Sequence, residues 1–307
     1  MVERAEGAAR SATGAYVVLV VAMFIASANP VVGRGIIQDV PPFALCFWRF
    51  VAAAVALAPF AMGPLHQQQA LFRRQWKRLA AMGFIGFSSY NAFLYLGVQT
   101  TTAINAALIT TMAPVAILAI TWVIHRERIG AIGVAGMVLG LLGVAVTVTH
   151  GDLAILYRLD LVPGDLLMIL AVLGFAFYSL LLRQLEPGTN PIAFMLIVDL
   201  WALLAVTPFY LWELAQGQSF AVTWGALGAI LYVGVMATAV SFTMYTQAAS
   251  VVGASAAAQV IYLTPVFASV MAVVFLGESF GWHHVLGAAF ICGGIYLSTR
   301  ALRVRRV

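Results

Sequence analysis

The sequence is poor in charged residues, which occupy only 9% of its 307 positions. A soluble domain carries about 25% charged residues. Hydrophobic residues make up 63% of the chain, and the mean hydropathy is +0.99. A chain of this composition has too little polar surface to face water on all sides, so most of its surface must lie in lipid. The longest expected connections, 63–76 and 149–164, are too short for a separate soluble domain.

Cysteine is also scarce, with two residues in the chain. Cys46 and Cys292 each lie in an apolar run, which predicts unreactive thiols rather than a disulfide or a metal pair. The five histidines fall in or beside expected loops, and no span contains an HExxH motif, a GxSxG motif or a cluster of metal ligands. These absences disfavour an intramembrane enzyme and predict no catalytic residue, no metal site and no cofactor.

Long apolar runs dominate the sequence. A transmembrane helix needs about 20 predominantly apolar residues, and the first such run lacks a cleavage pattern, so it is expected to be a signal-anchor span. The predicted fold class is an all-α integral membrane protein of ten transmembrane helices. They are expected at 15–36, 41–62, 78–98, 102–124, 129–148, 164–183, 191–211, 224–248, 254–276 and 283–302.

Basic residues are distributed unevenly among the expected loops. With a cytoplasmic N-terminus, thirteen of the sixteen Lys and Arg residues fall in cytoplasmic loops and tails, Arg34 and Arg158 stay outside, and Arg49 lies within a span. Lys and Arg near span ends favour the cytoplasmic side. Both termini are therefore predicted to be cytoplasmic. The net charge of +5 is attributed to membrane orientation, with no nucleic-acid partner expected.

The two halves of the chain resemble each other. Residues 98–146 align without a gap with residues 249–297, at a separation of 151 positions. A separation of 149 pairs Pro42 with Pro191, and one of 148 pairs Gly86 with Gly234. The predicted domains are a first five-helix repeat at 1–150 and a second at 151–307. Identical pairs at 151 include Ala106/Ala257, Pro114/Pro265, Glu127/Glu278, Gly136/Gly287 and Gly143/Gly294.

An odd number of spans in each repeat has a geometric consequence. The second repeat must enter the membrane from the opposite side, so the repeats are expected to be related by a pseudo-two-fold axis in the membrane plane. Inverted repeats are typical of secondary transporters, whose substrate site lies near the midplane between the halves. The alternative is a duplicated membrane scaffold without transport.

The repeated pattern resembles the EamA family of the drug/metabolite transporter superfamily. The resemblance rests on residues 26–30 in the first span, on Pro42 and Arg49-Phe50 in the second, and on the pattern from Ala103 to Gly143 that recurs from Ala254 to Gly294. It covers nearly the whole chain and is closest to the YddG-type amino-acid exporters. It implies a carrier of the bacterial inner membrane with a central cavity lined by spans 1, 3, 4, 6, 8 and 9, and with spans 5 and 10 at the periphery.

Polar residues within the spans indicate where a substrate could bind, because polar groups in lipid are costly unless they face protein or water. Ser88, Asn91 and Tyr95 share one helical face, and Thr238, Ser241 and Tyr245 repeat it 150 positions later. Interhelical hydrogen bonding is the alternative role for such residues, and for Ser88 and Thr238 the preferred one. Trp48 is left open between cavity and packing. The expected cavity residues are Tyr90, Asn91, Tyr95, Tyr178, Trp201, Ser241, Tyr245, Gln259 and Tyr262.

Two ionisable residues, Arg49 and Asp199, lie well inside expected spans. An intramembrane charge is a functional hypothesis by default. One interpretation has Arg49 bind a substrate carboxylate, while Asp199 binds an ammonium group or a coupling proton. The alternatives are a structural ion pair and separate pairing with helix-end carbonyls. A separation of 149 places Arg49 opposite Val198, so the two charges are not equivalent positions of the repeats.

Proline positions predict breaks in three spans, because proline removes a helical hydrogen bond and kinks the helix. The expected hinge or kink residues are Asn29, Pro30, Pro114 and Pro265. Static bends that serve only packing are the alternative. Gly136, Gly140 and Gly143 allow close helix contact, which is expected within the molecule rather than at a dimer face.

The predicted function is therefore a secondary transporter that exports amino acids or related small metabolites by alternating access. Drugs or cationic metabolites, and sugars or nucleotide sugars, are alternative substrates, and a channel is a further alternative. The expected partners are a small-molecule substrate and the lipid bilayer, with the chain a monomer or weak dimer.

Overall fold

The computed structural model describes residues 2–36, 39–101, 103–125, 130–149, 151–152, 154, 162–267, 270–271 and 281–304. Within these ranges the regular structure is helical and contains no strand, which confirms the all-α prediction. Six described helices are long and apolar enough to cross a membrane. They comprise Pro42–Gln67, Trp76–Gly97, Ala131–Val148, Pro163–Leu182, Pro191–Ala215 and Trp224–Val252. Shorter apolar helices lie at Thr13–Ser27, Ala113–Ile124 and Ala256–Phe267, and the count of ten spans stays a prediction.

Several helices follow one another within a single expected span. In the first repeat the elements are α1 (Val2–Ser27), α2 (Asn29–Ile36), α3 (Pro42–Gln67), α4 (Gln69–Arg74), α5 (Trp76–Ala81), η1 (Met82–Phe87), α6 (Ser88–Gly97), α7 (Ala103–Thr111), α8 (Ala113–His125) and α9 (Ala131–Val148). In the second repeat they are α10 (Pro163–Leu182), α11 (Pro191–Ala215), α12 (Trp224–Leu231), η3 (Tyr232–Val240), α13 (Ser241–Val252), α14 (Ala254–Gln259), η4 (Val260–Leu263) and α16 (Trp282–Val304).

Breaks in three expected spans coincide with the predicted prolines. The helix of the first span is interrupted between α1 and α2, directly before Pro30. The fourth is interrupted between α7 and α8, directly before Pro114, and the ninth narrows to the 3₁₀ segment η4 two residues before Pro265. Proline fits the first turn of a helix but not its interior, which explains where the new helices begin. Whether the breaks act as hinges stays a prediction.

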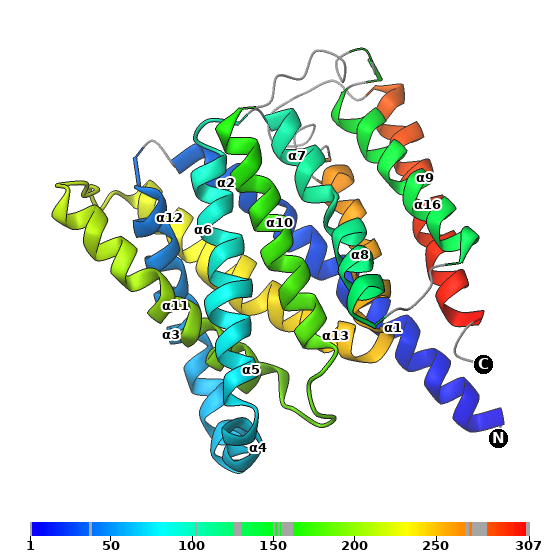
Figure 1. The fold of residues 1–307 in the computed structure, drawn as a ribbon, viewed down its shortest axis with the longest axis horizontal. Helices are drawn as coiled ribbons and strands as arrows, with labels where there is room; N and C mark the ends of the chain where they lie inside the picture. Colours follow the sequence, from blue (N-terminus) through cyan, green and yellow to red (C-terminus); the bar gives the residue numbers. More distant parts are fainter. Residues whose placement is uncertain are drawn as a thin grey trace.

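The helices α9 and α16 pack against each other at one edge of the bundle (Figure 1). A Cβ on Gly136 would lie 2.7 Å from the Gly294 carbonyl oxygen, and one on Gly143 would lie 2.7 Å from that of Gly287. Contact residues thus rise along α9 as they fall along α16, so the two helices are antiparallel. The glycines are used inside the molecule, as predicted.

The contacts of this helix pair obey a two-fold relation. Gly136 and Gly287 are equivalent positions of the repeats, as are Gly143 and Gly294, so each contact is the other with the repeats exchanged. Gly136 also approaches Ser298, while Gly287 approaches Thr147, the residue equivalent to Ser298. Equivalent helices of the two repeats therefore run in opposite directions and meet across a pseudo-two-fold axis.

The same relation holds where α3 and α11 pack against the π-helical segments η1 and η3. A Cβ on Gly83 would meet Trp201 Cβ, and would lie 2.6 Å from the Val198 carbonyl oxygen. One on Gly234 would meet Ala52 Cβ and the Arg49 carbonyl oxygen, each at 2.6 Å. The equivalence of Arg49 with Val198 is thereby confirmed.

The partner of Gly234 in the first repeat is therefore Gly83. The expected pairing of Gly234 with Gly86 is wrong, because a Cβ on Gly86 would meet Tyr178 of α10 instead. The separation of 148 matches the starts of α5 and α12, at Trp76 and Trp224. More residues lie between Trp224 and Gly234 than between Trp76 and Gly83, so the separation increases along this span. A separation of 151 applies from Gly83 onward.

Buried carboxylates link the repeats at helix N-termini. Glu213 of α11 accepts hydrogen bonds from the backbone N–H groups of Phe43 and Ala44 in α3, at 3.1 and 2.7 Å. Asp165 of α10 accepts from Asn105 of α7 at 2.8 Å and from Thr101. Glu213 supplies an acceptor for N–H groups at the start of α3 that have no partner within that helix. Asp165 supplies an acceptor for the polar side chains at the start of the fourth span.

At the other end of α3, exposed polar contacts hold the α10–α11 loop. The Arg74 guanidinium forms an ion pair with Glu186, and Arg78 donates to the Gln184 carbonyl. The Gln68 side chain donates to the Gly188 carbonyl and accepts from the Asn190 N–H, both at 2.8 Å. The second and seventh spans are thus tied together at both ends.

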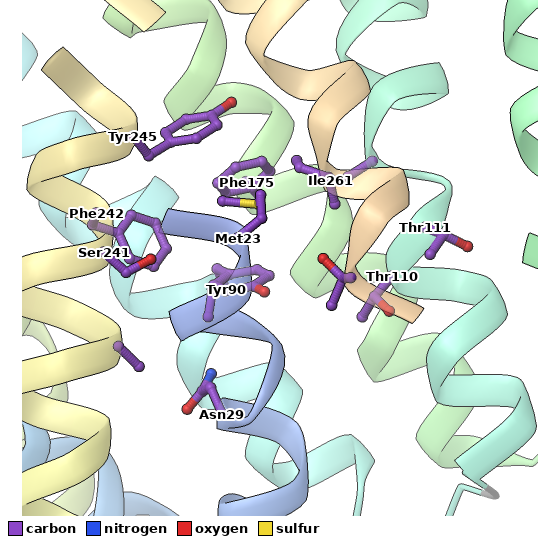
Figure 2. A pocket seen from close by; sticks show the side chains of 14 residues that line it. Met23, Asn29, Tyr90, Thr110, Thr111, Phe175, Ser241, Phe242, Tyr245 and Ile261 are labelled. Carbon is purple, nitrogen blue, oxygen red and sulfur yellow. The ribbon is translucent and has the colours of Figure 1, made fainter. Parts of the chain in front are cut away.

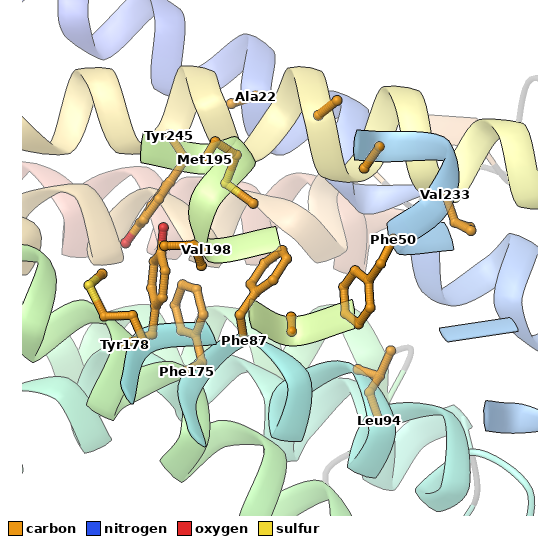
Figure 3. Packing of buried hydrophobic residues seen from close by; sticks show 14 of the residues in the cluster. Ala22, Phe50, Phe87, Leu94, Phe175, Tyr178, Met195, Val198, Val233 and Tyr245 are labelled. Atoms are coloured by element: carbon orange, nitrogen blue, oxygen red, sulfur yellow. The ribbon is translucent and has the colours of Figure 1, made fainter. Parts of the chain in front are cut away.

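Aromatic residues fill the core between these helices (Figure 3). The Phe87 ring centroid lies 4.8 Å from that of Phe242, 5.5 Å from Phe50 and 6.0 Å from Tyr178. Five tryptophans near the ends of the expected spans are exposed, as an aromatic belt at the membrane surface requires. They are Trp76, Trp122, Trp212, Trp224 and Trp282.

Candidate functional site

A cavity of about 90 Å³ lies between the two repeats (Figure 2). Its wall is formed by α1, α6, α7, α8, α10, η3, α13 and η4, together with Asn29 at the start of α2 and Thr264 directly after η4. The lining residues are Met23, Ala26, Asn29, Tyr90, Thr110, Thr111, Ala113, Phe175, Ala237, Ser241, Phe242, Tyr245, Ile261 and Thr264.

Three pairs of lining residues are equivalent positions of the two repeats. At a separation of 151, Tyr90 corresponds to Ser241, Thr110 to Ile261, and Ala113 to Thr264, and all six line the cavity. A cavity to which both members of a pair contribute lies on the pseudo-two-fold axis. The pairs also differ in polarity, so the wall is symmetric in backbone position and asymmetric in chemistry.

Among the described residues, the cavity lining contains no charged side chain, and aromatic rings form much of it. The Phe175 ring centroid lies 5.4 Å from that of Tyr90, 5.9 Å from Tyr245 and 6.3 Å from Phe242. Figure 2 shows these rings grouped on one side of the cavity, with Thr110 and Thr111 on the other. The wall can therefore pack on apolar groups and offer hydroxyl and amide hydrogen bonds, but it supplies no counter-charge.

A buried hydrogen-bond network lies behind the wall and is centred on Arg49. Its Nε donates to Thr238 Oγ1 and its Nη1 donates to the Tyr95 hydroxyl, both at 2.7 Å. The Tyr95 hydroxyl in turn donates to Asn29 Oδ1 at 3.1 Å. Arg49 is fully buried, and its Nη2 has no hydrogen-bond partner among the described residues. Asn29 connects this network to the cavity, because it belongs to both.

The second intramembrane charge, Asp199, lies on α11 next to α3 and is also fully buried. Neither carboxyl oxygen has a hydrogen-bond partner within the described part of the chain. The structure thus holds Arg49 through a tyrosine and a threonine, and leaves Asp199 outside that network. The ion pair considered from sequence is not formed in this conformation.

The structure places the predicted cavity residues in two groups. Tyr90, Ser241 and Tyr245 line the cavity. Asn91 donates to the Phe87 carbonyl at 2.8 Å, and the Tyr178 hydroxyl lies 3.1 Å from Thr246 Oγ1. The remaining predicted residues are buried or half-buried outside the lining: Tyr95, Trp201, Gln259 and Tyr262. Trp48, left open from sequence, is 38% exposed and donates to the Tyr210 hydroxyl at 3.2 Å.

Sequence reasoning missed several lining residues. It aligned the third and eighth spans at 150 positions, which matched Asn91 with Ser241, whereas a separation of 151 matches Tyr90 with Ser241. The same separation, continued through the fourth and ninth spans, would have drawn attention to Thr110 and Ala113. Apolar lining residues give no such sequence pattern, because they look like any other core position. The residues missed for that reason include Met23, Phe175 and Phe242.

No cluster of His, Cys, Asp or Glu that could hold a metal ion occurs among the residues that the structure describes. The sequence profile of the EamA-like transporter family matches residues 13–149 and 162–300, once for each repeat. The chain belongs to the EamA-like transporter family. Membership confirms the resemblance to this family, and it makes the protein a multi-pass membrane transporter for a small-molecule substrate. The likeness to YddG-type exporters stays a prediction.

Relatives at 23–27% identity match most of the chain. The uncharacterized transporter YetK of Bacillus subtilis is 27% identical, over 93% of this chain and 86% of its own. An uncharacterized transporter of Archaeoglobus fulgidus is 24% identical, over 86% of this chain and 89% of its own. A WAT1-related chloroplast protein of Arabidopsis thaliana is 23% identical, over 92% of this chain and 68% of its own.

The fold has also been solved by crystallography. A crystal structure of a protein 18% identical to this EamA-type chain superposes with a TM-score of 0.72, and covers 96% of this chain and 98% of its own. This likeness supports the architecture and says nothing of the substrate.

Proposed function

We propose that this EamA-type protein exports amino acids or closely related small zwitterions across the bacterial inner membrane by alternating access. The observation that supports the proposal most is the uncharged cavity on the pseudo-two-fold axis. Equivalent helices on either side of such an axis can exchange conformations, which moves access from one face of the membrane to the other. Both termini are proposed to be cytoplasmic, and the chain to act as a monomer or weak dimer.

The chemistry of the wall favours a solute with balanced charge. A substrate with a net negative charge would lack a cationic partner in the wall, and burying an unpaired charge is costly. The rings of Phe175, Phe242 and Tyr245 offer a surface for an apolar or aromatic side chain. The Asn29 amide and the Ser241 hydroxyl offer hydrogen bonds to the polar end. A cavity of about 90 Å³ also favours a small solute over a nucleotide sugar.

An organic cation is a second candidate substrate, and the aromatic wall is the observation that favours it. Tyrosine and phenylalanine rings attract cations through their faces, by about 0.5–2 kcal/mol per contact. The cavity is lined by Tyr90, Phe175, Phe242 and Tyr245, and the lining residues that the structure describes include no basic one. This would make the protein an exporter of drugs or cationic metabolites.

Exchange in proteoliposomes tests both candidates. Vesicles that contain the purified full-length protein are loaded with unlabelled solute, and entry of radiolabelled L-phenylalanine, L-threonine, glucose or tetraphenylphosphonium is measured. We expect exchange of phenylalanine, and the organic-cation candidate instead predicts exchange of tetraphenylphosphonium. If neither amino acid exchanges, the proposed substrate class is wrong.

A variant that fills the cavity tests whether the solute passes through it. Ala237 lines the cavity and is 1% exposed, so Ala237→Phe would occupy part of the substrate space. We expect exchange to fall at least tenfold in Ala237→Phe. Gly228→Ala, where an added Cβ meets nothing within 4 Å, should exchange like the parent protein. Equal exchange by all three proteins would show that solute does not pass through this cavity.

A further inference from the structure

The Asp199 carboxyl group is a buried acid that no hydrogen bond accounts for. It lies in the middle of α11, is 0% exposed, and has two oxygens without a partner in the described ranges. An ionised carboxylate in such a position is strongly disfavoured, because nothing replaces the water it has lost. The neutral acid avoids most of that cost. In this conformation the site therefore suits a protonated carboxyl group.

The charged surroundings of Asp199 are simple. The elements packed against α11 are α3, η1, α5, α6 and α13. Arg49, on the neighbouring helix α3, is fully buried like Asp199. The titratable and charged side chains on those elements and on α11 itself are Cys46, Arg49 and His66, Lys77 and Arg78, Tyr90 and Tyr95, Tyr245, and Tyr210 and Glu213.

Arg49 has one donor nitrogen to spare. Its Nε and Nη1 are occupied by Thr238 and Tyr95, whereas Nη2 is buried and has no partner in the described structure. A guanidinium with a free donor and a carboxyl group with two free acceptors thus sit on two neighbouring helices. A relative movement of α3 and α11 that brings the two side chains together would let an ionised Asp199 accept from Nη2.

We propose that Asp199 is the site of a coupling proton, and that Arg49 is the partner of its ionised form. In the conformation described, Asp199 is a neutral acid. When its site opens to an aqueous phase, the O–H bond breaks, the proton passes to water, and the electron pair stays on the carboxylate, which then pairs with Arg49 Nη2. The reverse step on the other side of the membrane moves one proton per cycle. The inference rests on the proposed transport function and adds proton antiport to it.

The network behind the wall connects this proton site to the cavity. Arg49 holds the Tyr95 hydroxyl, and the Tyr95 hydroxyl holds the Asn29 amide that lines the cavity. When Arg49 moves toward an ionised Asp199, its hydrogen bond to Tyr95 weakens, and the Asn29 side chain is released to bind the substrate. Proton binding and substrate binding are coupled through these two hydrogen bonds, although Asp199 itself does not touch the substrate.

Gradient-driven transport compared with exchange tests the proposal. Proteoliposomes that contain the full-length protein are given an inside-acid pH gradient, and accumulation of radiolabelled L-phenylalanine is measured, with tetraphenylphosphonium as the probe if only that solute exchanges. We expect the parent protein to accumulate the probe. Asp199→Asn should still exchange the probe, at a severalfold lower rate because Asn29 stays held by Tyr95, while accumulation falls to the external concentration. Glu186→Gln, which alters an exposed carboxylate, should keep both.

The outcomes separate the two proposals. Exchange and unchanged gradient-driven accumulation in Asp199→Asn would overturn the proton site and leave the transport function standing. No exchange of any probe by the parent protein would overturn the transport function.

Infrared spectroscopy tests the proton site without any substrate. The carbonyl stretch of a protonated carboxylic acid should be present at neutral pH in the parent protein, absent in Asp199→Asn, and lost at high pH. If the parent spectrum lacks that band, Asp199 is already ionised and the proposal is wrong. This readout also applies if Asp199→Asn transports poorly because its folding is impaired.

Discussion

Single glycines set how closely the two repeats approach each other. At Gly294 an added Cβ would lie 2.6 Å from the Gly136 carbonyl oxygen and 2.7 Å from the Gly140 nitrogen. Both are backbone atoms, which cannot rotate away as a side chain can. The helices α9 and α16 would have to separate, and their contact depends on packing because lipid supplies no hydrophobic drive for helix association.

We expect Gly294→Ala to lower the free energy of unfolding by about 1–3 kcal/mol, the usual cost of overpacking. Gly143→Ala should cost a similar amount, because its Cβ would meet the equivalent atoms in the other repeat, including the Ile291 nitrogen at 2.8 Å. Thermal unfolding of the purified protein in detergent measures both. Gly228→Ala is the control and should not lower stability; equal losses at all three positions would remove the packing explanation.

The Tyr95 hydroxyl both accepts from Arg49 and donates to Asn29, so Tyr95→Phe removes two buried hydrogen bonds at once. We expect a loss of about 1–3 kcal/mol, because a buried donor of Arg49 is left unsatisfied. The KM for the exchanged solute should fall, because Asn29 is then free to bind the solute, as it is when Arg49 pairs with an ionised Asp199. Tyr296→Phe, at a residue that is 61% exposed, is the control. A fall in stability with an unchanged KM would show that the network does not reach the cavity.

The sequence predicted which residue types would matter, but not where each would point. Tyr90 and Tyr245 were expected in the cavity and lie there, whereas Asn91, one position from Tyr90, instead donates to the Phe87 carbonyl. The π-helical segment η1 precedes Tyr90 and Asn91, and it rotates the helix that follows relative to a regular α-helix. Helical periodicity alone cannot register such a rotation.

Among the secondary-structure elements, α3 is stabilised at its start by another helix. Its N-cap residue, Pro41, offers no side-chain hydrogen bond, and Glu213 of α11 provides the missing acceptor. Glu213 is 3% exposed, so its bonds are little weakened by water. From sequence, Glu213 looked like an ordinary charge at the end of a span, because its partners lie 170 and 169 positions away.

We expect Glu213→Ala to reduce the free energy of unfolding by about 1–2 kcal/mol, as loss of a helix cap does. Glu186→Ala should cost at most about 1 kcal/mol, because its ion pair with Arg74 is exposed to solvent. Chemical or thermal unfolding in the same detergent compares the two. If Glu186→Ala lowered the free energy of unfolding more than Glu213→Ala, the exposed contacts beyond the end of α3 would matter more than the buried cap at its start.

The helix breaks were predictable, because proline states its own geometric requirement. The breaks before Pro30, Pro114 and Pro265 were located from sequence to within two residues. The segments η1 and η3 were not predicted, since no residue type demands a π-helix. The backbone of the structure shows where these segments lie, and the contacts of Gly83 and Gly234 show that the two segments are equivalent.

For the whole molecule, the duplicated sequence predicted the two-repeat architecture, and the glycine contacts give it a two-fold axis. Sidedness in the membrane is a separate matter that labelling can decide. Gln67 ends α3 and Gln216 follows α11, and both are exposed. Since α3 and α11 are equivalent and antiparallel, these two positions should face opposite aqueous phases.

We expect a membrane-impermeant maleimide to label Gln216→Cys in intact cells, and Gln67→Cys only after the cells are permeabilised. Cys46 and Cys292 are first replaced by serine so that the introduced thiol is the one that reacts. The expected side of each position follows from the distribution of Lys and Arg, which favours a cytoplasmic N-terminus. Labelling of both positions from the same side would contradict the inverted arrangement.

The contact between α9 and α16 has one more consequence. Because Gly136 touches Gly294 while its equivalent Gly287 touches Gly143, each repeat presents the other with the same surface that it receives. An isologous surface of this kind needs no second sequence to be complementary. A single five-helix unit, made as its own polypeptide and inserted into the bilayer in both orientations, would already carry a face able to pair with its own upside-down copy.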